Sequence, residues 1–286
     1  MTFWEHTEEF IKRLKVPLYT LVIATVAMMV FPANISFLSN PFAYYEPLVA
    51  VILRLIREQV LPSNVKLIGF EFVAPIELYF VASFFFGFAV TAPVLAYEIF
   101  RFIDPALYPH ERRALYPFIL SFLTLFVGGL VLGYFLLVPY GIAALLPFFQ
   151  ITGAEPVISV TSFYYFVFFL TLMTGVVSTF PVFLVLFVKF GIVKTKTLTK
   201  NRTYVYFALL VLVLLITPGE GGLANFMLFF VMALLFEGGI LVAKHYEKKG
   251  EIREPRWLIE APKCKFCKKA IPASATFCPK CGKSQK

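Results

Sequence analysis

Residues 102–113 read FIDPALYPHERR and separate two long apolar runs, at residues 73–100 and 114–138. A short polar turn between two such runs is typical of a membrane protein, at the surface where two spanning helices meet. Pro105 and Pro109 disfavour helix in the residues before them, so the first helix is expected to end close to this turn. The turn therefore predicts a pair of neighbouring membrane helices.

The composition of the whole chain agrees with this interpretation. Hydrophobic residues make up 59% of the sequence and charged residues 15%, and the mean hydropathy is +0.81. A soluble domain is roughly a quarter charged. Residues 1–15 mix acidic and basic side chains, so we expect an amphipathic lead-in there rather than a cleavable signal peptide. The composition predicts an all-α, polytopic membrane protein.

Six spans are expected, and they cover residues 16–37, 73–102, 114–137, 163–190, 204–216 and 223–242. The fifth is short, so either the bilayer thins around it or the fifth and sixth form a re-entrant hairpin. Pro93 and Pro181 predict kinks in the second and fourth spans, and Pro139 with Pro147 predicts that the helix breaks beyond the third. The charged residues within 48–61 predict a helix that lies on the membrane surface.

The distribution of basic residues predicts which side each turn faces. All but three of the 26 lysines and arginines fall on one side of the predicted spans, and the exceptions are Arg54, Arg57 and Lys66. Cytoplasmic segments of helical membrane proteins carry the excess of Lys and Arg. Both termini and the 102–113 turn are therefore expected in the cytoplasm, in an N-in, C-in arrangement in the cytoplasmic (cell) membrane.

The net charge of +9 is concentrated in the C-terminal tail, where residues 244–286 hold twelve basic residues and four glutamates. Anionic lipid headgroups explain such a tail, and nucleic acid is not the expected partner. We divide the chain into a cytoplasmic lead-in (1–15), a six-helix membrane domain (16–246), a linker (247–262) and a small tail domain (263–286).

All four cysteines lie in this tail, as two Cys-x-x-Cys pairs with ten residues between them: Cys264 with Cys267, and Cys278 with Cys281. Each pair can chelate from one tight turn, which suits tetrahedral zinc–sulfur coordination. The alternatives are a redox dithiol or a pair of disulfides. A cytoplasmic location disfavours stable disulfides, and a redox motif needs only one such pair. The pattern predicts a zinc ribbon whose zinc is structural.

Signals for catalysis are weak. Gly282-Lys283-Ser284 resembles the end of a phosphate-binding loop, but Phe277 stands where the first glycine of that loop is required. The three histidines are expected at the cytoplasmic surface and lack the spacing of metal ligands. We therefore expect a protein that is not an enzyme.

Several polar side chains are predicted within or near the bilayer, where such groups are costly and usually face a protein cavity or a partner. Glu98 lies near the cytoplasmic end of the second span, and it either faces a cavity or snorkels beside Arg101. Asn225 lies inside the sixth span and favours a hydrogen bond between helices over a substrate contact. Glu220 is expected near the opposite face of the membrane.

These motifs together resemble the TatC family, the receptor subunit of the twin-arginine protein translocase. The six spans, the lead-in HTEEFIKRL at residues 6–14 and the 102–113 turn carry the resemblance. It continues through residues 92–102, 180–182, 191–193, 217–218 and 235–237, and it covers the chain from about Phe3 to Tyr246. In this family, short fifth and sixth helices are normal.

The resemblance implies which residues bind cargo. The family's substrates are folded proteins whose signal peptides carry adjacent arginines, and two guanidinium groups suit carboxylates that can bind them in bidentate geometry. The glutamates that take this role in the family correspond to Glu9 and Glu111. The same surface is expected to include Phe102, Pro105, Leu107 and Tyr108. The hydrophobic part of the signal peptide is expected to insert along a concave helix bundle.

The chain departs from the family pattern at several positions. Ile11 replaces the arginine that usually follows the lead-in glutamate by two residues, and Lys12 or Arg13 is expected to compensate. The polar residue of the fourth span, commonly glutamate, is Thr179, whereas Glu98 stands where the family commonly has glutamine. We hypothesise that the buried acid has moved from the fourth span to the second across one cavity. The family's aspartate after Thr-Pro and its span-six glutamine are approximated by Glu220 and Asn225.

The resemblance also implies partners. A TatC-type receptor assembles with single-span subunits of the TatA type, and of the TatB type where present, and exports folded proteins with the proton motive force. Contacts with membrane lipids and self-association are expected, because one chain is too small to enclose a pore for a folded protein. The alternative function is a secondary transporter of a small solute, which should show internal repeats that this sequence lacks.

Overall fold

The computed structural model describes residues 3–33, 45–63, 65–103, 109–189, 193–216, 222–248, 264, 266–267, 277 and 280–284. For residues 3–7, 103, 109–117, 216, 222–224 and 248 it describes the backbone only. The chain forms two compact units, which we call unit 1 (Met1–Thr179 with Leu212–Met232) and unit 2 (Phe180–Val211 with Ala233–Lys286).

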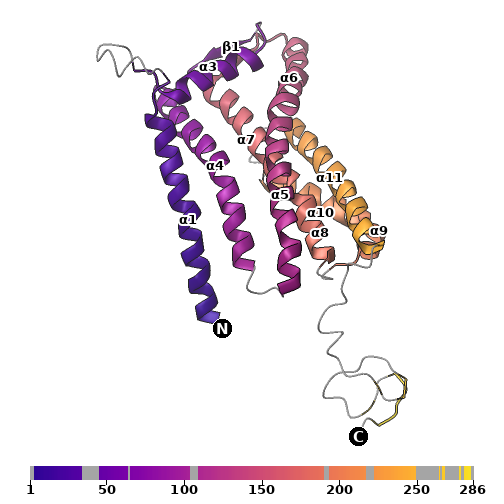
Figure 1. The fold of residues 1–286 in the computed structure, drawn as a ribbon. Helices are drawn as coiled ribbons and strands as arrows, with labels where there is room; N and C mark the ends of the chain where they lie inside the picture. The colour runs from indigo at the N-terminus through magenta and orange to yellow at the C-terminus, as the bar shows by residue number, and fades with distance from the viewer. Residues whose placement is uncertain are drawn as a thin grey trace. The chain divides into compact units, whose positions relative to one another are not determined.

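Five helical segments among the described residues are long and apolar enough to cross a membrane (Figure 1). They are Glu8–Val30, Ala74–Phe102, Phe118–Thr152, Val160–Lys189 and Asn225–Glu247. The fifth predicted span, 204–216, forms a shorter apolar helix, α10 (Arg202–Ile216). The prediction of an all-α polytopic membrane fold is thus confirmed, whereas six as the number of crossings stays a prediction.

The lead-in and the first span form one continuous helix, α1 (Phe3–Val30), with Pro17 inside it. The helix ends two residues before Pro32, so the first span ends earlier than the predicted boundary at residue 37. Proline disfavours helix in the residue ahead of it, which explains the earlier end. Because there is no break near residue 15, the position of the lead-in follows the position of the first span.

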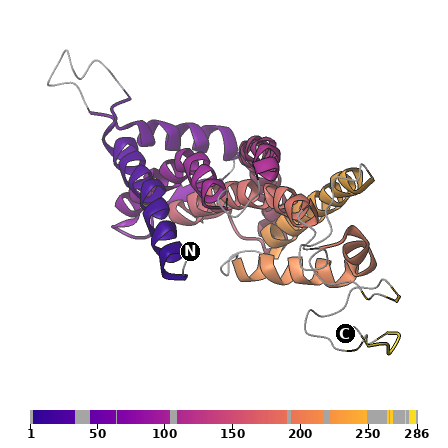
Figure 2. The same cartoon turned by 60° about the horizontal axis from the view of Figure 1, so that its bottom comes forward.

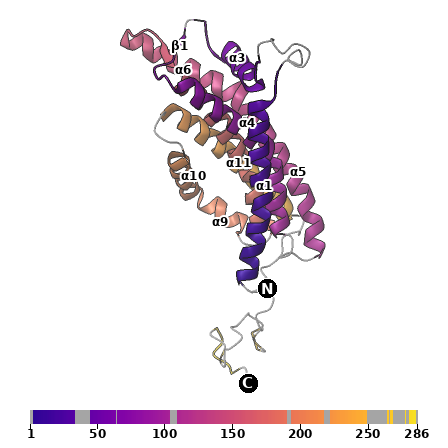
Figure 3. The ribbon, with the colours of Figure 1, turned by 90° about the vertical axis from the view of Figure 1, so that its left-hand side faces the viewer.

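Helix α1 lies alongside α4 (Ala74–Ile103) in unit 1 (Figures 1 and 3). The two backbones approach closely at Gly87, where an added Cβ atom would lie 2.5 Å from Thr25 Oγ1 and 2.9 Å from Thr25 N. The hydroxyl of Tyr79 on α4 also donates a hydrogen bond to the carbonyl of Met29 on α1. A small residue and an interhelical hydrogen bond are typical of helix pairs in membranes.

The third predicted span, 114–137, was expected to end at a break, and this expectation is wrong. Helix α5 (Pro109–Leu132) continues through a π-helical turn, η2 (Gly133–Leu137), into α6 (Val138–Thr152). Pro139 is the second residue of α6 and lacks the backbone N–H that an α-helix would use as a donor. The wider hydrogen-bonding pattern of the π turn before it accommodates this loss. The apolar segment Phe118–Thr152 is about 52 Å long, which exceeds a hydrocarbon core of about 30 Å. Part of this helix must therefore project beyond the core.

Helix α5 packs against α7 (Val160–Ser178) through glycines. An added Cβ atom at Gly129 would lie 2.4 Å from Ser178 Oγ, and one at Gly133 would lie 3.0 Å from atoms of Thr171 and Thr174. Small residues at four-residue spacing allow membrane helices to approach closely. Gly129 of α5, Gly133 of η2 and the hydroxyl-bearing residues of α7 therefore form this interface.

Helix α3 (Leu48–Val60) confirms the predicted helix at residues 48–61, and it runs crosswise to α1 and α4 (Figures 1 and 2). Its apolar face buries Val49, Ile56 and Val60. The hydroxyl of Tyr164 on α7 donates to the carbonyl of Leu53 on α3, at 2.7 Å. Beside this helix, β1 (Lys66–Ile68) pairs in parallel with β2 (Val157–Ser159).

The predicted kink at Pro181 is a helix break. Helix α7 ends at Ser178, and α8 (Phe180–Lys189) begins one residue before the proline. Proline at the second position of a helix costs little, because the N–H it lacks would have no partner there. The fourth predicted span therefore consists of two helices.

Polar contacts join the helices of unit 2. Helix α9 (Thr195–Lys200) precedes α10, and the hydroxyl of Thr195 donates to the carboxylate of Glu247 on α11 (Gly222–Lys248). Glu237 on α11 accepts a hydrogen bond from the Tyr206 hydroxyl at 2.5 Å and pairs with Arg202 at 3.3 Å. Both partners belong to α10, so Glu237 joins the last two apolar helices of the chain.

Candidate functional site

The predicted cargo-binding residues come from three helix ends in unit 1. The start of α1, the end of α4 and the start of α5 lie at the same end of the unit (Figure 1). The rings of Phe10 and Phe102 meet edge to face, with 5.2 Å between centroids and 64° between planes. This contact joins the lead-in to the end of α4, immediately next to Glu9.

The carboxylate of Glu9 is bound by an arginine of its own helix. Arg13 donates to Glu9 Oε1 from Nη2 at 2.6 Å and from Nε at 3.1 Å. The two side chains are 24% and 21% exposed, so water screens the pair only in part. Ile11, which replaces the family's arginine, is exposed. Of the two predicted substitutes, Lys12 and Arg13, the structure identifies Arg13 as the partner of Glu9.

Glu111 is the third residue of α5, and its side chain lies outside the described residues. The same holds for Pro105, Leu107 and Tyr108 in the turn. The helix dipole favours a carboxylate in the first turn of a helix, and Glu111 occupies such a position in α5. That Glu9 and Glu111 act together on two guanidinium groups stays a prediction, although α1 and α5 begin at the same end of unit 1.

The intramembrane polar residues differ in how their groups are satisfied. Glu98 is buried at 8% exposure, and its contact with Arg101 is long, at 4.0 Å from Oε1 to Nη1. Arg101 is 58% exposed and therefore snorkels as that alternative expects, whereas the buried Glu98 does not. Thr179 is buried and donates to the carbonyl of Val176 at 2.7 Å, so it caps the end of α7. Asn225 is half-buried on α11, and Glu220 lies outside the described residues.

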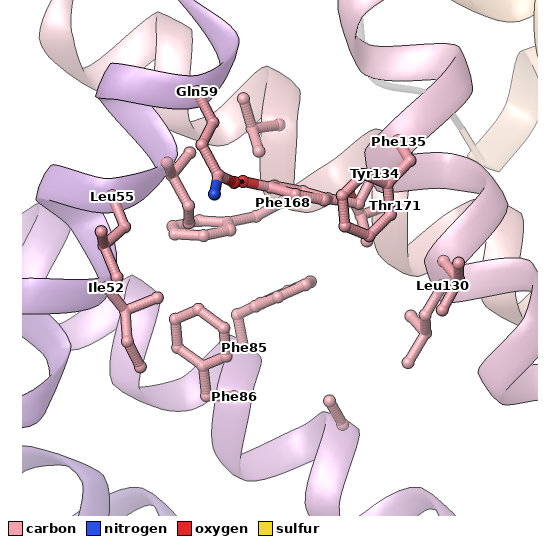
Figure 4. Close-up of a pocket in the computed structure, with 14 residues that line it drawn as sticks. Ile52, Leu55, Gln59, Phe85, Phe86, Leu130, Tyr134, Phe135, Phe168 and Thr171 are labelled. Atoms are coloured by element: carbon pink, nitrogen blue, oxygen red, sulfur yellow. Dashed lines mark hydrogen bonds between the residues drawn. The ribbon is translucent and has the colours of Figure 1, made fainter.

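An apolar pocket of about 430 Å³ lies in unit 1 between α3, α4, α5 with η2, and α7 (Figure 4). Its lining includes Leu55, Phe86, Leu130, Phe135 and Phe168. At its rim the hydroxyl of Tyr134 donates to Gln59 Oε1 at 2.8 Å (Figure 4). One further lining atom, Thr171 Oγ1, is buried and has no hydrogen-bond partner among the described residues.

The sequence interpretation missed this pocket as a set of residues. Its aromatic side chains come from three separate segments, α4, η2 and α7, and each lies within an apolar run whose period is that of ordinary helix packing. A pocket of this kind depends on how the helices cross. Two of its residues, Tyr134 and Phe135, belong to the π-helical turn at Gly133–Leu137, and π-helical turns are frequent at functional sites.

Three of the four cysteines lie together in the tail. The Sγ atoms of Cys264, Cys267 and Cys281 are all within 4.8 Å of one another, and Cys264 and Cys281 are 3.6 Å apart. Tetrahedral zinc–thiolate bonds of about 2.3 Å place sulfur atoms about 3.8 Å apart. The three thiols therefore have the spacing of metal ligands, and the predicted fourth, Cys278, lies outside the described residues.

The backbone around these cysteines favours a thiolate. The N–H groups of Cys267 and Phe266 donate to Cys264 Sγ at 3.5 and 3.4 Å, and they lower the pKa of its thiol to about 6. A single antiparallel bridge joins Phe277 to Ser284 across the second Cys-x-x-Cys pair. Gly282 turns the chain there with φ +69°, a conformation that favours glycine. These features are those of a metal-binding knuckle.

A family model described as Sec-independent protein translocase protein (TatC) matches residues 5–240. The chain belongs to the TatC family. This match includes the lead-in, the 102–113 turn and the helices through most of α11. It ends before the tail, so the cysteine cluster lies beyond the matched TatC region.

Individual TatC relatives agree with the family model. TatCy of Bacillus subtilis (strain 168) is 30% identical over 251 residues, which cover 88% of this chain and 92% of the relative. TatC of Aquifex aeolicus (strain VF5) is 30% identical over 240 residues, covering 82% of this chain and 95% of the relative. A crystal structure of the twin-arginine translocase receptor TatC is similar with a TM-score of 0.70 and 26% identity, over 85% of this chain and 99% of the other.

TatC membership establishes the broad function of this protein. It is a component of the Sec-independent, twin-arginine protein translocase and a multi-pass protein of the cytoplasmic membrane. It acts in protein transport as a receptor and not as an enzyme. The alternative, a secondary transporter of a small solute, is not favoured by any of these similarities.

Proposed function

We propose that this TatC protein binds twin-arginine signal peptides in unit 1, where the start of α1, the end of α4 and the start of α5 lie together. Glu9 and Glu111 are the carboxylates that bind the two guanidinium groups. The observation that carries the proposal is the contact of Phe10 with Phe102, at 5.2 Å between ring centroids. It brings the lead-in acid to the turn that leads to the second acid. Guanidinium groups bind carboxylates through two parallel hydrogen bonds, a geometry that lysine cannot reproduce.

The apolar pocket is a suitable site for the hydrophobic part of the signal peptide. Phe86 in the pocket and Phe102 at the proposed arginine site both belong to α4, sixteen residues apart. That separation corresponds to about 24 Å along the helix axis. A helical apolar segment of about sixteen residues would therefore reach from the arginines to the pocket. Cargo would then be held by charge at one end and by apolar contact at the other.

Site-specific crosslinking tests this proposal in the full-length protein. A synthetic twin-arginine signal peptide with a photoreactive group beside the arginines should crosslink to the start of α1 and the start of α5. Glu9→Gln or Glu111→Gln should each lower the yield about tenfold or more, because a charge-assisted hydrogen-bonded pair contributes about 1.5–3 kcal/mol. Glu58→Gln removes an exposed acid from α3 and is the matched control. Equal yields in all three variants would contradict the proposal.

In the tail, we infer that Cys264, Cys267, Cys278 and Cys281 hold one structural zinc ion. The close approach of three thiols and the backbone N–H groups around Cys264 support this inference. Four thiolates complete a tetrahedral shell and leave no position for water, which suits a structural rather than a catalytic ion. Other family members usually lack a cofactor, so the ion would serve this chain's own tail.

The remaining inferences concern assembly. We infer that the protein acts with single-span TatA-type subunits, and with a TatB type where present, in a complex that also contains further copies of this chain. The export of folded cargo would draw on the proton motive force, since the sequence has no complete nucleotide-binding loop. Copurification of tagged protein with its neighbours in the membrane tests these partners.

A further inference from the structure

The acid proposed to bind cargo is already paired with an arginine of the same helix. Arg13 approaches Glu9 Oε1 with two nitrogen atoms, at 2.6 and 3.1 Å. Within the described part of the chain, the Arg13 side chain makes hydrogen bonds to Glu9 only. The aromatic contact of α1 with the end of α4 is made by Phe10, so a substitution of Arg13 removes no part of that ring contact.

The group that Arg13 presents is the same chemical group that a twin-arginine peptide carries. A guanidinium from cargo cannot occupy the same hydrogen-bonding position on Glu9 while Arg13 holds it, because two like charges would lie within a few ångström of each other. Bidentate binding uses both oxygens of the carboxylate, so a cargo guanidinium that binds Glu9 in this geometry requires Arg13 to leave Oε1. The free energy of the internal pair is then subtracted from the binding free energy of every ligand that uses Glu9.

We propose that Arg13 is an internal competitor for the signal-peptide site and sets the affinity threshold that a cargo peptide must exceed. This inference rests on the proposed function of Glu9. A site that is competent only when Arg13 has moved away binds every ligand more weakly by the same factor, the fraction of time the site is open. A ligand with two arginines then still binds at the working concentration of peptide. A ligand with lysines has a lower affinity and stays mostly unbound at that concentration.

The proposal predicts a uniform gain in affinity when Arg13 loses its charge. A partly exposed ion pair contributes up to about 1 kcal/mol, so Arg13→Gln should tighten binding about two- to fivefold. The gain should be the same for a peptide with two arginines and for one with two lysines. Arg13→Lys should give a smaller gain, because a lysine holds a carboxylate less firmly than a guanidinium does.

The measurement is fluorescence anisotropy of labelled signal peptides on the full-length protein in lipid nanodiscs. Lys15→Gln is the matched control, since it removes the same charge from an exposed site of the same helix and should change affinity less than twofold. In a Glu9→Gln background there is no acid to compete for, so adding Arg13→Gln should produce no further gain.

Different results overturn this inference and the proposed function. If Arg13→Gln weakens binding, or tightens it by unequal factors for the two peptides, Arg13 orients Glu9 or contacts the ligand and the competitor role is wrong. If Glu9→Gln leaves the affinity for the twin-arginine peptide unchanged, the proposed site itself is wrong. If the gain from Arg13→Gln persists without Glu9, the effect is general electrostatics and the inference fails.

Discussion

The helices of unit 1 and the cysteine-containing tail reach their structures in opposite ways. In unit 1, helices bury apolar side chains and approach closely at glycines. Examples are Gly87 against Thr25 and Gly129 against Ser178. The tail has few buried side chains among its described residues, and its centre is a group of three thiols. Packing therefore defines the first region, and metal binding is what we propose for the second. Changes that affect one region should leave the other intact.

Removal of the proposed zinc ion is expected to have the largest effect, and only in the tail. Zinc binding supplies about 10–16 kcal/mol to small domains that lack a core of their own. Cys264→Ser should abolish zinc content, measured by inductively coupled plasma mass spectrometry, and should expose residues 263–286 to proteolysis. The thermal unfolding of the helices should not change. Lys280→Ala, within the second knuckle but without a thiol, is the control.

The contrast between the two regions would be wrong in either of two cases. The first case is a purified wild-type protein that carries no zinc although all four thiols are reduced. The second is a Cys264→Ser variant whose helices lose as much melting temperature as a core substitution would cost. The first result would remove the metal from the tail, and the second would show that the tail supports the membrane domain.

The glycine contacts of unit 1 provide the next largest effect, with an internal control. An added Cβ at Gly129 would lie 2.4 Å from Ser178 Oγ, whereas one at the adjacent Gly128 would meet nothing within 4 Å. Gly129→Leu should therefore destabilise the helices by about 1–3 kcal/mol through overpacking. Gly128→Leu should be close to neutral. Thermal unfolding in detergent measures both, and equal losses would show that α5 and α7 do not pack as described.

Much of this membrane fold was predictable, because the length of an apolar run reports directly on the thickness of the bilayer that it must cross. The orientation inferred from the basic residues stays a prediction. The second span and the surface helix at residues 48–61 were located correctly within about two residues. The break expected at Pro139 was wrong, since a proline rule describes an α-helix and a π turn relaxes it. The apolar pocket could not be predicted, because it arises where four helices cross.

The candidate site was predictable where it depends on local spacing. Arg13 was one of two basic residues expected to compensate for Ile11, and it lies one helical turn after Glu9, where such a pair can form. The contact between Phe10 and Phe102 joins residues far apart in the chain, so only the packing of α1 on α4 could reveal it. For the same reason, the family resemblance located Glu111 in the sequence, but spacing could not identify its role.

Glu98 provides a smaller effect that tests the hypothesis of a displaced membrane acid. Glu98 is 8% exposed, and its carboxylate lies a full 4.0 Å from an exposed arginine, so the pair itself contributes little. If Glu98 serves transport across a cavity shared with Thr179, Glu98→Gln should reduce export severalfold while Arg101→Gln has little effect. An export assay with a folded reporter measures both. Unchanged export and stability in Glu98→Gln would remove the hypothesis, and equal defects in both variants would favour the snorkelling pair.

The smallest effect concerns the aromatic contact that joins the lead-in to α4. An edge-to-face pair contributes about 0.5–1.5 kcal/mol beyond its buried area, and Phe10 is 44% exposed, so the lower end applies. Phe10→Ala should leave global unfolding nearly unchanged but weaken signal-peptide binding about two- to threefold. The start of α1 is then no longer fixed beside the end of α4, and Glu9 loses its defined position. Phe10→Tyr keeps the ring and should bind as the wild type does. If Phe10→Ala bound equally well, the continuous α1 helix alone would be sufficient to position Glu9.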